Sequence, residues 1–283
     1  MLSIIVCSRT PDVSLSLYEN IEKSVGCIYE LITIDNSENR YSIFEAYNLG
    51  IQKSRFEFLC FIHDDIFIHT KNWGNAIVDI FVSDDKIGLI GVAGSKIKSK
   101  MPSPWWNCPE SQRIINVIQH YDHKDKENMV SGFDENSNIE ASVIDGVFMA
   151  ARKKEMIKFA PDMKGFHNYD INISLEYKKH AYKVIITNQV TLEHFSTGKL
   201  SADWVKSCYY IHRKYKSILP LSSKTGTISK QTEVANAANF IEECMTYKKY
   251  NIAFFIWLKL FILFPRLKWQ ISFLKRILKK SVC

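Results

Sequence analysis

The residues best suited to chemistry follow the apolar run Phe56–Ile62, which ends abruptly in His63, Asp64 and Asp65. A nearly continuous apolar run of this kind is typical of a buried strand in a parallel sheet. Two carboxylates at the end of such a strand are costly unless a cation lies beside them. Carboxylates and imidazoles bind divalent metals, and a metal here could carry a phosphorylated substrate. The alternative is a pair of turn or helix-capping acids, because Asp often follows a strand.

Two earlier strand-like segments also end in polar side chains. The β-branched segment Leu2–Ser8 is followed by Arg9, and Glu30–Ile34 is followed by Asp35. Helix-like segments separate the three strands, and this alternation predicts βαβ units with a parallel sheet. Because ligands bind at the carboxyl ends of strands in such sheets, we expect these polar groups to gather along one edge.

These segments, together with several later ones, resemble the GT-A-type glycosyltransferases, close to the family 2 group. Leu2–Arg9 resembles the opening strand of that family, and Ile34–Ser37 resembles its second-strand Asp motif. Ala46–Ile51 resembles its Asn-containing helix, and Ile62–Asp65 lies where the family has its Asp-x-Asp motif. Later in the chain, Asp145–Ala150 and Arg152 resemble the strand that lines the donor sugar. Phe166–Asp170 resembles the segment that bears the catalytic base, and Leu192–His194 resembles the late His after the last core strand. The resemblance covers residues 1–215, and its specificity lies in the order of the motifs.

The resemblance implies a GT-A fold, which is a Rossmann-like α/β fold with a mostly parallel sheet flanked by helices. It also implies a divalent metal, Mn²⁺ or Mg²⁺, with Asp65 as the first choice of ligand, His194 as the second, and His63 or Asp64 as further ligands. The residues that it assigns to the nucleotide or the donor sugar are Arg9, Asp35, Asp64, Asp145 and Gly146.

Two positions depart from the family pattern. His63 replaces the first Asp of the Asp-x-Asp motif, and imidazole suits Mg²⁺ or Mn²⁺ less well than carboxylate does. Asn172 stands where many relatives carry a second acid after the catalytic base.

Asp170 is the catalytic base that the resemblance implies. It precedes an expected helix at 171–180, so a helix N-cap is its alternative role. His167 is a competing base, because the pKa of imidazole lies near neutrality. Simpler roles also exist for the other candidates: turn acids for Asp35 and Asp145, a strand cap for Arg9, and a core or surface histidine for His194.

The chain divides into an expected glycosyltransferase domain at 1–217, a linker at 218–232 and a helical tail at 233–283. From Met245 onward there are nine Lys or Arg and no acid, whereas the first 244 residues carry 28 basic and 30 acidic side chains. The apolar run Ile252–Pro265 is too short to span a membrane, and 267–280 alternates apolar and basic residues at helical spacing. Such helices bind anionic membrane surfaces; packing on the catalytic domain or in a homodimer is the alternative.

Composition excludes other classes of protein. The seven cysteines are scattered without a Cys-x-x-Cys pair, which argues against a disulfide framework or a zinc site. The basic residues form no nucleic-acid-binding motif. A strand-like segment opens the chain, so we expect no signal peptide and a cytoplasmic location, with peripheral attachment to the inner face of the membrane as an option.

We expect Met101–Glu140 to be polar and irregular, with Trp105 and Trp106 either stacking on a sugar or anchoring the loop.

The expected function is therefore transfer of a sugar from a nucleotide-sugar donor to a saccharide or lipid-linked acceptor, in surface polysaccharide or glycan synthesis. A single displacement with inversion is favoured, because the sequence offers a base but no obvious covalent nucleophile. One alternative is a metal-dependent nucleotidyltransferase, which would need a Gly-rich basic phosphate loop that Cys7–Pro11 does not supply. Another is a non-catalytic nucleotide- or sugar-binding protein, suggested by His63.

Overall fold

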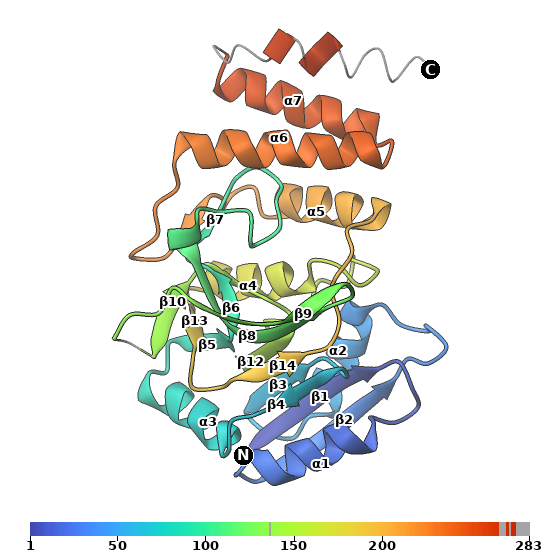
Figure 1. Cartoon of the computed structure of the whole chain (residues 1–283), viewed down its shortest axis with the longest axis vertical. Helices are drawn as coiled ribbons and strands as arrows, with labels where there is room; N and C mark the ends of the chain where they lie inside the picture. Colours follow the sequence, from blue (N-terminus) through green and yellow to red (C-terminus); the bar gives the residue numbers. More distant parts are fainter. Residues whose placement is uncertain (136, 266–269, 272, 276–283) are drawn as a thin grey trace.

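A seven-stranded sheet forms the centre of the computed structural model, which describes residues 1–135, 137–265, 270–271 and 273–275 (Figure 1). Its strands lie in the order β10-β13-β5-β12-β3-β1-β2. Their bounds are Asn138–Ala141 for β10, Lys183–Thr187 for β13, Ile87–Gly91 for β5, Phe148–Arg152 for β12, Phe58–Ile62 for β3, Leu2–Ser8 for β1 and Tyr29–Asp35 for β2.

Five of these strands run in one direction, while β12 and β10 run against them. The structure confirms the predicted α/β class, although the antiparallel strands make the sheet mixed. The interior strands β3 and β5 are apolar and buried along their whole length, because both faces of the sheet are covered. The carboxyl ends of β1, β2 and β3 consequently meet at the same edge.

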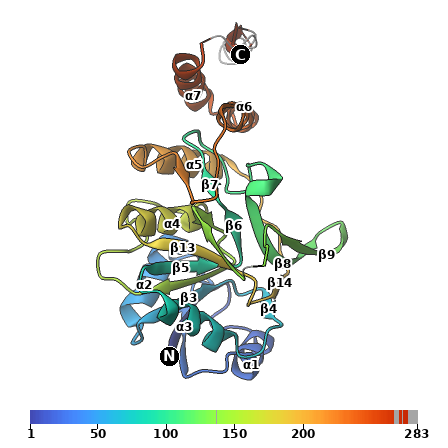
Figure 2. The ribbon, with the colours of Figure 1, turned by 90° about the vertical axis from the view of Figure 1, so that its left-hand side faces the viewer.

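Helices cover both faces of the sheet (Figure 2). Aromatic contacts place α2 (Ile43–Lys53) and α4 (Tyr169–Lys179) on one face, where Tyr47 touches both Phe61 and Tyr169. On the other face lie α1 (Leu15–Ser24) and α3 (Trp73–Ser83), whose Trp73 packs against Phe148. Each helix buries an apolar side, and α2 begins with a capping box between Ser42 and Glu45.

A second, smaller sheet lies beside the first, with the strand order β11-β6-β8-β14-β4 and β9 paired to β8. Its strands are β11 (Val143–Ile144), β6 (Ala93–Ser95), β8 (Arg113–Tyr121), β14 (Leu192–His194), β4 (Ile66–Ile68) and β9 (Lys124–Ser131). The expectation of an irregular segment at 101–140 holds for 101–109, where no helix or strand forms, and is wrong for β8, β9 and the start of β10. The hairpin of β8 and β9 was not predicted, because β9 is almost wholly exposed and so lacks an apolar face.

Three helices follow the second sheet: α5 (Ala202–Lys214), α6 (Lys230–Thr246) and α7 (Tyr250–Leu263). Between them β15 (Leu221–Ser222) pairs with β7 (Ile97–Lys98), and a 3-10 turn at Glu110–Gln112 precedes β8. The buried sides of the three helices share one apolar cluster, in which Trp204 of α5 meets Phe240 of α6. The expected amphipathic segment at 267–280 lies largely outside the described residues. Among the residues described, no helix has the length and apolar character needed to cross a membrane.

The side chain of Asn20 fixes the position of β4. Its amide donates to the carbonyl of Ile68 at 2.9 Å and accepts the Ile68 N–H at 2.8 Å, and all of these groups are buried. We expect Asn20→Ala to lower the free energy of unfolding by about 2 kcal/mol or more, because two buried backbone groups lose their partners. Urea denaturation measures this change. Asn75→Ala is the matched control, since Asn75 is exposed and makes one bond to Gly26; an equal loss in both variants would contradict the assignment.

Candidate functional site

The pairing of β4 with β14 brings the two halves of the site together. His63, Asp64 and Asp65 occupy the turn between β3 and β4. His194 pairs with Ile66 across the antiparallel ladder, and the N–H of Phe195 donates to the carbonyl of Asp65 at 3.1 Å. A side chain at the end of β14 thus lies next to the end of β3, although 129 positions separate Asp65 from His194 in the sequence.

His63, Asp65 and His194 converge on one point. The Nδ1 atom of His63 lies 3.2 Å from Nε2 of His194. Oδ1 of Asp65 lies 3.8 Å from the former nitrogen and 3.6 Å from the latter. Two imidazoles and one carboxylate at such separations form a set of three donor atoms that could hold a metal ion.

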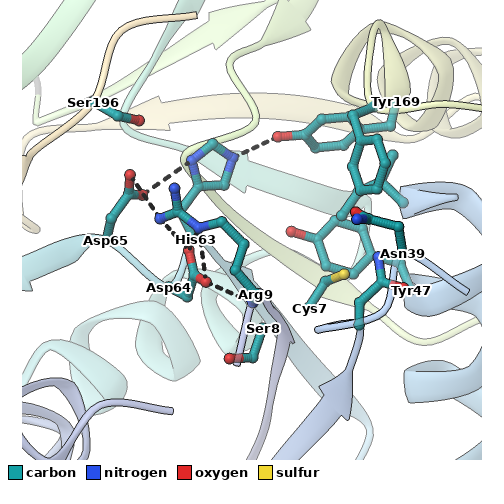
Figure 3. A pocket seen from close by; sticks show the side chains of 13 residues that line it. Cys7, Ser8, Arg9, Asn39, Tyr47, His63, Asp64, Asp65, Tyr169 and Ser196 are labelled. Atoms are coloured by element: carbon teal, nitrogen blue, oxygen red, sulfur yellow. Dashed lines mark hydrogen bonds and ion pairs between the residues drawn. The ribbon is translucent and has the colours of Figure 1, made fainter. Parts of the chain in front are cut away.

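The outer atoms of the two imidazoles have partners of their own. Nδ1 of His194 lies 3.0 Å from Oε1 of Gln119; because that oxygen only accepts, Nδ1 carries the proton and Nε2 keeps its lone pair. Nε2 of His63 lies 2.6 Å from the hydroxyl of Tyr169 (Figure 3). If this nitrogen donates to Tyr169, then Nδ1 of His63 also presents a lone pair. Outer partners of this kind orient histidines that bind metals, so the donor set fits a divalent cation.

Arg9 holds the acidic turn from the opposite side. Its backbone N–H and guanidinium donate to both carboxylate oxygens of Asp64 at 2.7–3.1 Å, and Nη2 lies 3.1 Å from Asp65. Asp64 is therefore engaged by Arg9 and lies outside the set of metal-binding atoms. The guanidinium itself remains 67% exposed and faces the neighbouring pocket.

Electrostatics favour a charged Asp65 carboxylate and a neutral His194 imidazole. Burial raises the pKa of Asp65, but a hydrogen bond from Ser196 and the charges of His63, His194 and Arg9 outweigh it, so this pKa lies below its ordinary value. Burial and the nearby His63 lower the pKa of His194. An ionised carboxylate and unprotonated imidazoles are the forms that bind metals.

A pocket with a volume of about 220 Å³ opens beside this group. Its walls include the ends of β1 and β3, the start of α4 and the segment before α2; the polar lining residues are Ser8, Arg9, Asn36, Asn39, His63, Asp64, Asp65 and Ser196. Asp35 does not line it. The Asp35 carboxylate accepts hydrogen bonds from the backbone and hydroxyl of Ser37, which lower its pKa, so the structure gives Asp35 the turn-forming geometry.

Asp145, Gly146 and Asp170 form a neighbouring group that Tyr169 connects to the histidines. Asp145 accepts hydrogen bonds from the Val147 N–H at 2.8 Å and from Nε1 of Trp105 at 2.7 Å. A Cβ atom on Gly146 would lie 2.3 Å from the Tyr169 hydroxyl, so only glycine leaves room for that contact. Trp105 anchors its loop on Asp145, whereas Trp106 is exposed.

Asp170 lies in the first turn of α4, directly after Tyr169. The N-cap is Asn168, so the alternative role of Asp170 as N-cap is wrong; its carboxylate instead accepts the Ile171 N–H at 2.8 Å. Burial, aided by the negative charge of Asp145, raises the pKa of Asp170 to about 7. The competing base His167 bonds to Ser201 at 3.1 Å, and burial lowers its pKa.

Sequence reasoning missed Tyr169, Gln119 and Ser196. Tyr169 stood inside the segment already matched to the family, next to Asp170. Gln119 lies on β8, where an irregular segment was expected, and no sequence pattern links it to His194. Ser196 follows His194 directly, and its proximity to the turn after β3 depends on the pairing of β4 with β14.

Known proteins were compared with the whole chain. The model of a family described as "Glycosyltransferase like family" matches residues 3–216. No curated protein sequence matches the chain.

Solved structures give distant likenesses. GalNAc-T7, crystallised with UDP, GalNAc and Mn²⁺, has a TM-score of 0.49 at 13% identity over 87% of this chain and 56% of its own. The mannosyltransferase PcManGT from Pyrobaculum calidifontis, in complex with GDP-Man and Mn²⁺, has a TM-score of 0.49 at 12% identity over 100% of this chain and 80% of its own. A197 from STIV has a TM-score of 0.38 at 10% identity over 81% of this chain and 96% of its own. The chain spans little more than half the length of GalNAc-T7.

The titration of Asp170 can be observed directly. We expect its carboxyl ¹³C resonance to titrate with a midpoint near pH 7, and Asp145→Asn to lower that midpoint by removing a neighbouring negative charge. An unfolded Asp titrates at about 3.9, so the folded state binds this proton more tightly. The stability contributed by Asp170 is therefore lost as pH rises from about 4 through 7. Asp170→Asn should unfold at pH 8 no more easily than the wild type, and a midpoint near 4 would contradict the assignment.

Proposed function

Since the chain belongs to the glycosyltransferase-like family whose model matches residues 3–216, we propose that it transfers a sugar from a nucleotide-sugar donor to a saccharide or lipid-linked acceptor. The observation that carries this proposal is the convergence of His63, Asp65 and His194 at the edge of a pocket. Asp170 does not line that pocket, but it follows Tyr169, whose hydroxyl bonds to His63. The reaction is inverting and depends on a divalent metal, and it serves surface polysaccharide or glycan synthesis.

His63, Asp65 and His194 would hold the metal, Mn²⁺ or Mg²⁺. When bound, the ion would neutralise charge on the diphosphate that leaves the donor. Two imidazoles among three donors favour Mn²⁺ over Mg²⁺, because magnesium prefers oxygen ligands. Tyr169 and Gln119 orient the imidazoles from outside.

Donor binding uses the pocket and the segments around it. The exposed guanidinium of Arg9 can pair with a diphosphate oxygen, because arginine donates well to phosphate. Asn36 and Asn39 line the wall on the side of β2, where Asp35 would accept hydrogen bonds from the nucleoside. Asp64 positions Arg9, and Asp145 with Gly146 borders the space for the donor sugar.

Asp170 acts as the general base. As the acceptor oxygen bonds to the anomeric carbon, the bond from that carbon to the diphosphate oxygen breaks and the acceptor proton passes to the Asp170 carboxylate. A pKa of about 7 suits this task, since about half of the base is ionised at neutral pH and it still binds a proton readily. One displacement at the anomeric carbon inverts its configuration.

The tail contacts an anionic membrane surface near the acceptor, which places the protein peripherally on the cytoplasmic face. On α7, Phe255 and Ile262 are exposed and Lys259 lies between them, a composition that suits a membrane interface. A homodimer through the same face is the competing arrangement.

The metal assignment predicts a measurable Mn²⁺ affinity. Asp65→Asn should weaken Mn²⁺ binding at least about 100-fold through loss of a charged ligand, and Tyr169→Phe about 10-fold through loss of its support for His63. Calorimetry and the electron paramagnetic resonance of Mn²⁺ both report binding without turnover. Asp64→Asn and His69→Ala are matched controls outside the three donors and should retain the affinity.

His63→Asp provides a sharper test, because it restores an acid at the family position. We expect this variant to shift the ratio of Mg²⁺ to Mn²⁺ affinity toward Mg²⁺. An unchanged ratio would exclude His63 as a ligand, and donor turnover that is equal with and without a chelator would exclude metal dependence altogether.

The base assignment predicts a specific kinetic pattern. Asp170→Asn should lower kcat about 100-fold or more, in line with the usual contribution of a general base, while donor affinity stays nearly unchanged. In the wild type, kcat should rise with pH and level off above about 7, because the ionised carboxylate is the active form. Normal kcat in Asp170→Asn together with its collapse in His167→Ala would move the base to His167.

A further inference from the structure

Two hollows adjoin along α7, and the larger one lies between α5 and α7, two helices on the same side of α6 (Figure 2). The larger has a volume of about 530 Å³, and the smaller one of about 300 Å³. Lys100, Phe255 and Lys259 line both, so together the hollows form one groove. It lies outside the pocket of the proposed transfer reaction, with which it shares no lining residue.

One end of the groove is strongly basic. Lys100, Arg213, Lys216 and Lys259 line the larger hollow, and neither hollow has an acidic side chain among its described lining residues. Glu233 lies next to this end and accepts the backbone N–H groups of Lys100 and Met101 at 2.8 and 3.0 Å. Lys259 donates to the carbonyl of Lys100, an arrangement that leaves its positive charge at the groove.

His212 contributes an unsatisfied polar atom to the same end. Its side chain is buried, and burial lowers its pKa well below the ordinary value, so the imidazole is neutral. Nδ1 lies 2.7 Å from the carbonyl of Cys208, whereas Nε2 has no hydrogen-bond partner among the described residues. The larger hollow therefore combines four cations with a neutral polar wall.

The other end of the groove shares Lys100 and Lys259 with the basic end and is otherwise apolar. Phe255, Leu258, Ile262 and Leu263 are 55%, 37%, 69% and 43% exposed, and all line the smaller hollow. The opposite side of α7 is already buried in the cluster shared with α5 and α6. An apolar surface with a basic rim is typical of a contact with an amphiphilic anion.

We propose that this groove binds one anionic phospholipid, with the phosphate at Arg213 and Lys216 and an acyl chain along Phe255 and Ile262. The inference deepens the membrane contact of the proposed function and rests on it for the source of the lipid. It does not depend on the transfer reaction. The complementarity of both charge and polarity along one groove selects a lipid over a free phosphate, which would leave the apolar end uncovered.

The test uses the full chain and mixed vesicles of phosphatidylglycerol and phosphatidylcholine at low salt. Arg213→Glu with Lys216→Glu should weaken vesicle binding about 25-fold or more, because each basic group near an anionic surface is worth about fivefold in affinity. The control variant carries Lys53→Glu and Lys86→Glu, the same change of charge at exposed positions at the end of α2 and before β5. It should bind the vesicles like the wild type.

A second pair of variants separates insertion from simple attraction. Phe255→Ser with Ile262→Ser keeps the charge and should weaken vesicle binding at least fivefold, whereas Val82→Ser on α3, 72% exposed, should not. Native mass spectrometry should detect one phosphatidylglycerol per chain, lost in both groove variants. Donor hydrolysis should stay at the wild-type rate in all of them, which distinguishes loss of the lipid site from failure of the proposed enzyme activity.

Several outcomes would overturn the proposal. They are absence of wild-type binding to the vesicles, groove variants that bind like their controls, and glycerol phosphate that binds as tightly as the lipid. A dimer that dissociates in Phe255→Ser with Ile262→Ser would identify a second copy of the chain as the occupant instead.

Discussion

The arrangement at the end of β3 depends on the need to balance negative charge at a buried sheet edge. Asp64 and Asp65 lie where the strand leaves the core, and uncompensated carboxylates there would be costly. Arg9, from the end of β1, neutralises Asp64 through both carboxylate oxygens and reaches Asp65 with one nitrogen. The remaining oxygen of Asp65 faces two imidazoles rather than another cation, and this leaves a place for a metal.

Tyr169 transmits that arrangement to the rest of the site. Its hydroxyl meets His63, its ring packs against Tyr47, and its position demands glycine at 146. The next residue is Asp170, beside Asp145. A single buried tyrosine thus fixes the spacing between the metal-binding atoms and the proposed base. Burial around it also raises the pKa of Asp170 and outweighs the opposing charge of Lys98.

The sequence predicted the α/β fold and the glycosyltransferase class, and the structure and the family match confirm both. Local patterns were sufficient for β1, β2 and β3, because buried strands read as apolar runs. They failed for the exposed strand β9, which carries no such pattern, and the largely apolar run Ile114–Val117 of its partner β8 was overlooked, so Gln119 was missed as well. They could not reveal the contact between His63 and Tyr169 either, because 106 positions separate the two residues and only the packed sheet and α4 bring them together. The roles of the site residues remain predictions.

Helix α5 links the two ends of the molecule through direct contacts. Its N-cap Ser201 bonds to His167, and Ser207 bonds to Asn168, so α5 holds the segment that leads into Tyr169 and Asp170. The last turn of the same helix supplies Arg213 to the basic end of the groove, Lys216 follows just after the helix ends, and the buried side of α5 shares an apolar cluster with α6 and α7. The orientation of the groove is therefore fixed relative to the catalytic segment by one helix rather than by a flexible linker. A lipid held in the groove would keep that segment at a constant distance from the membrane surface, as the proposed transfer to a lipid-linked acceptor would require.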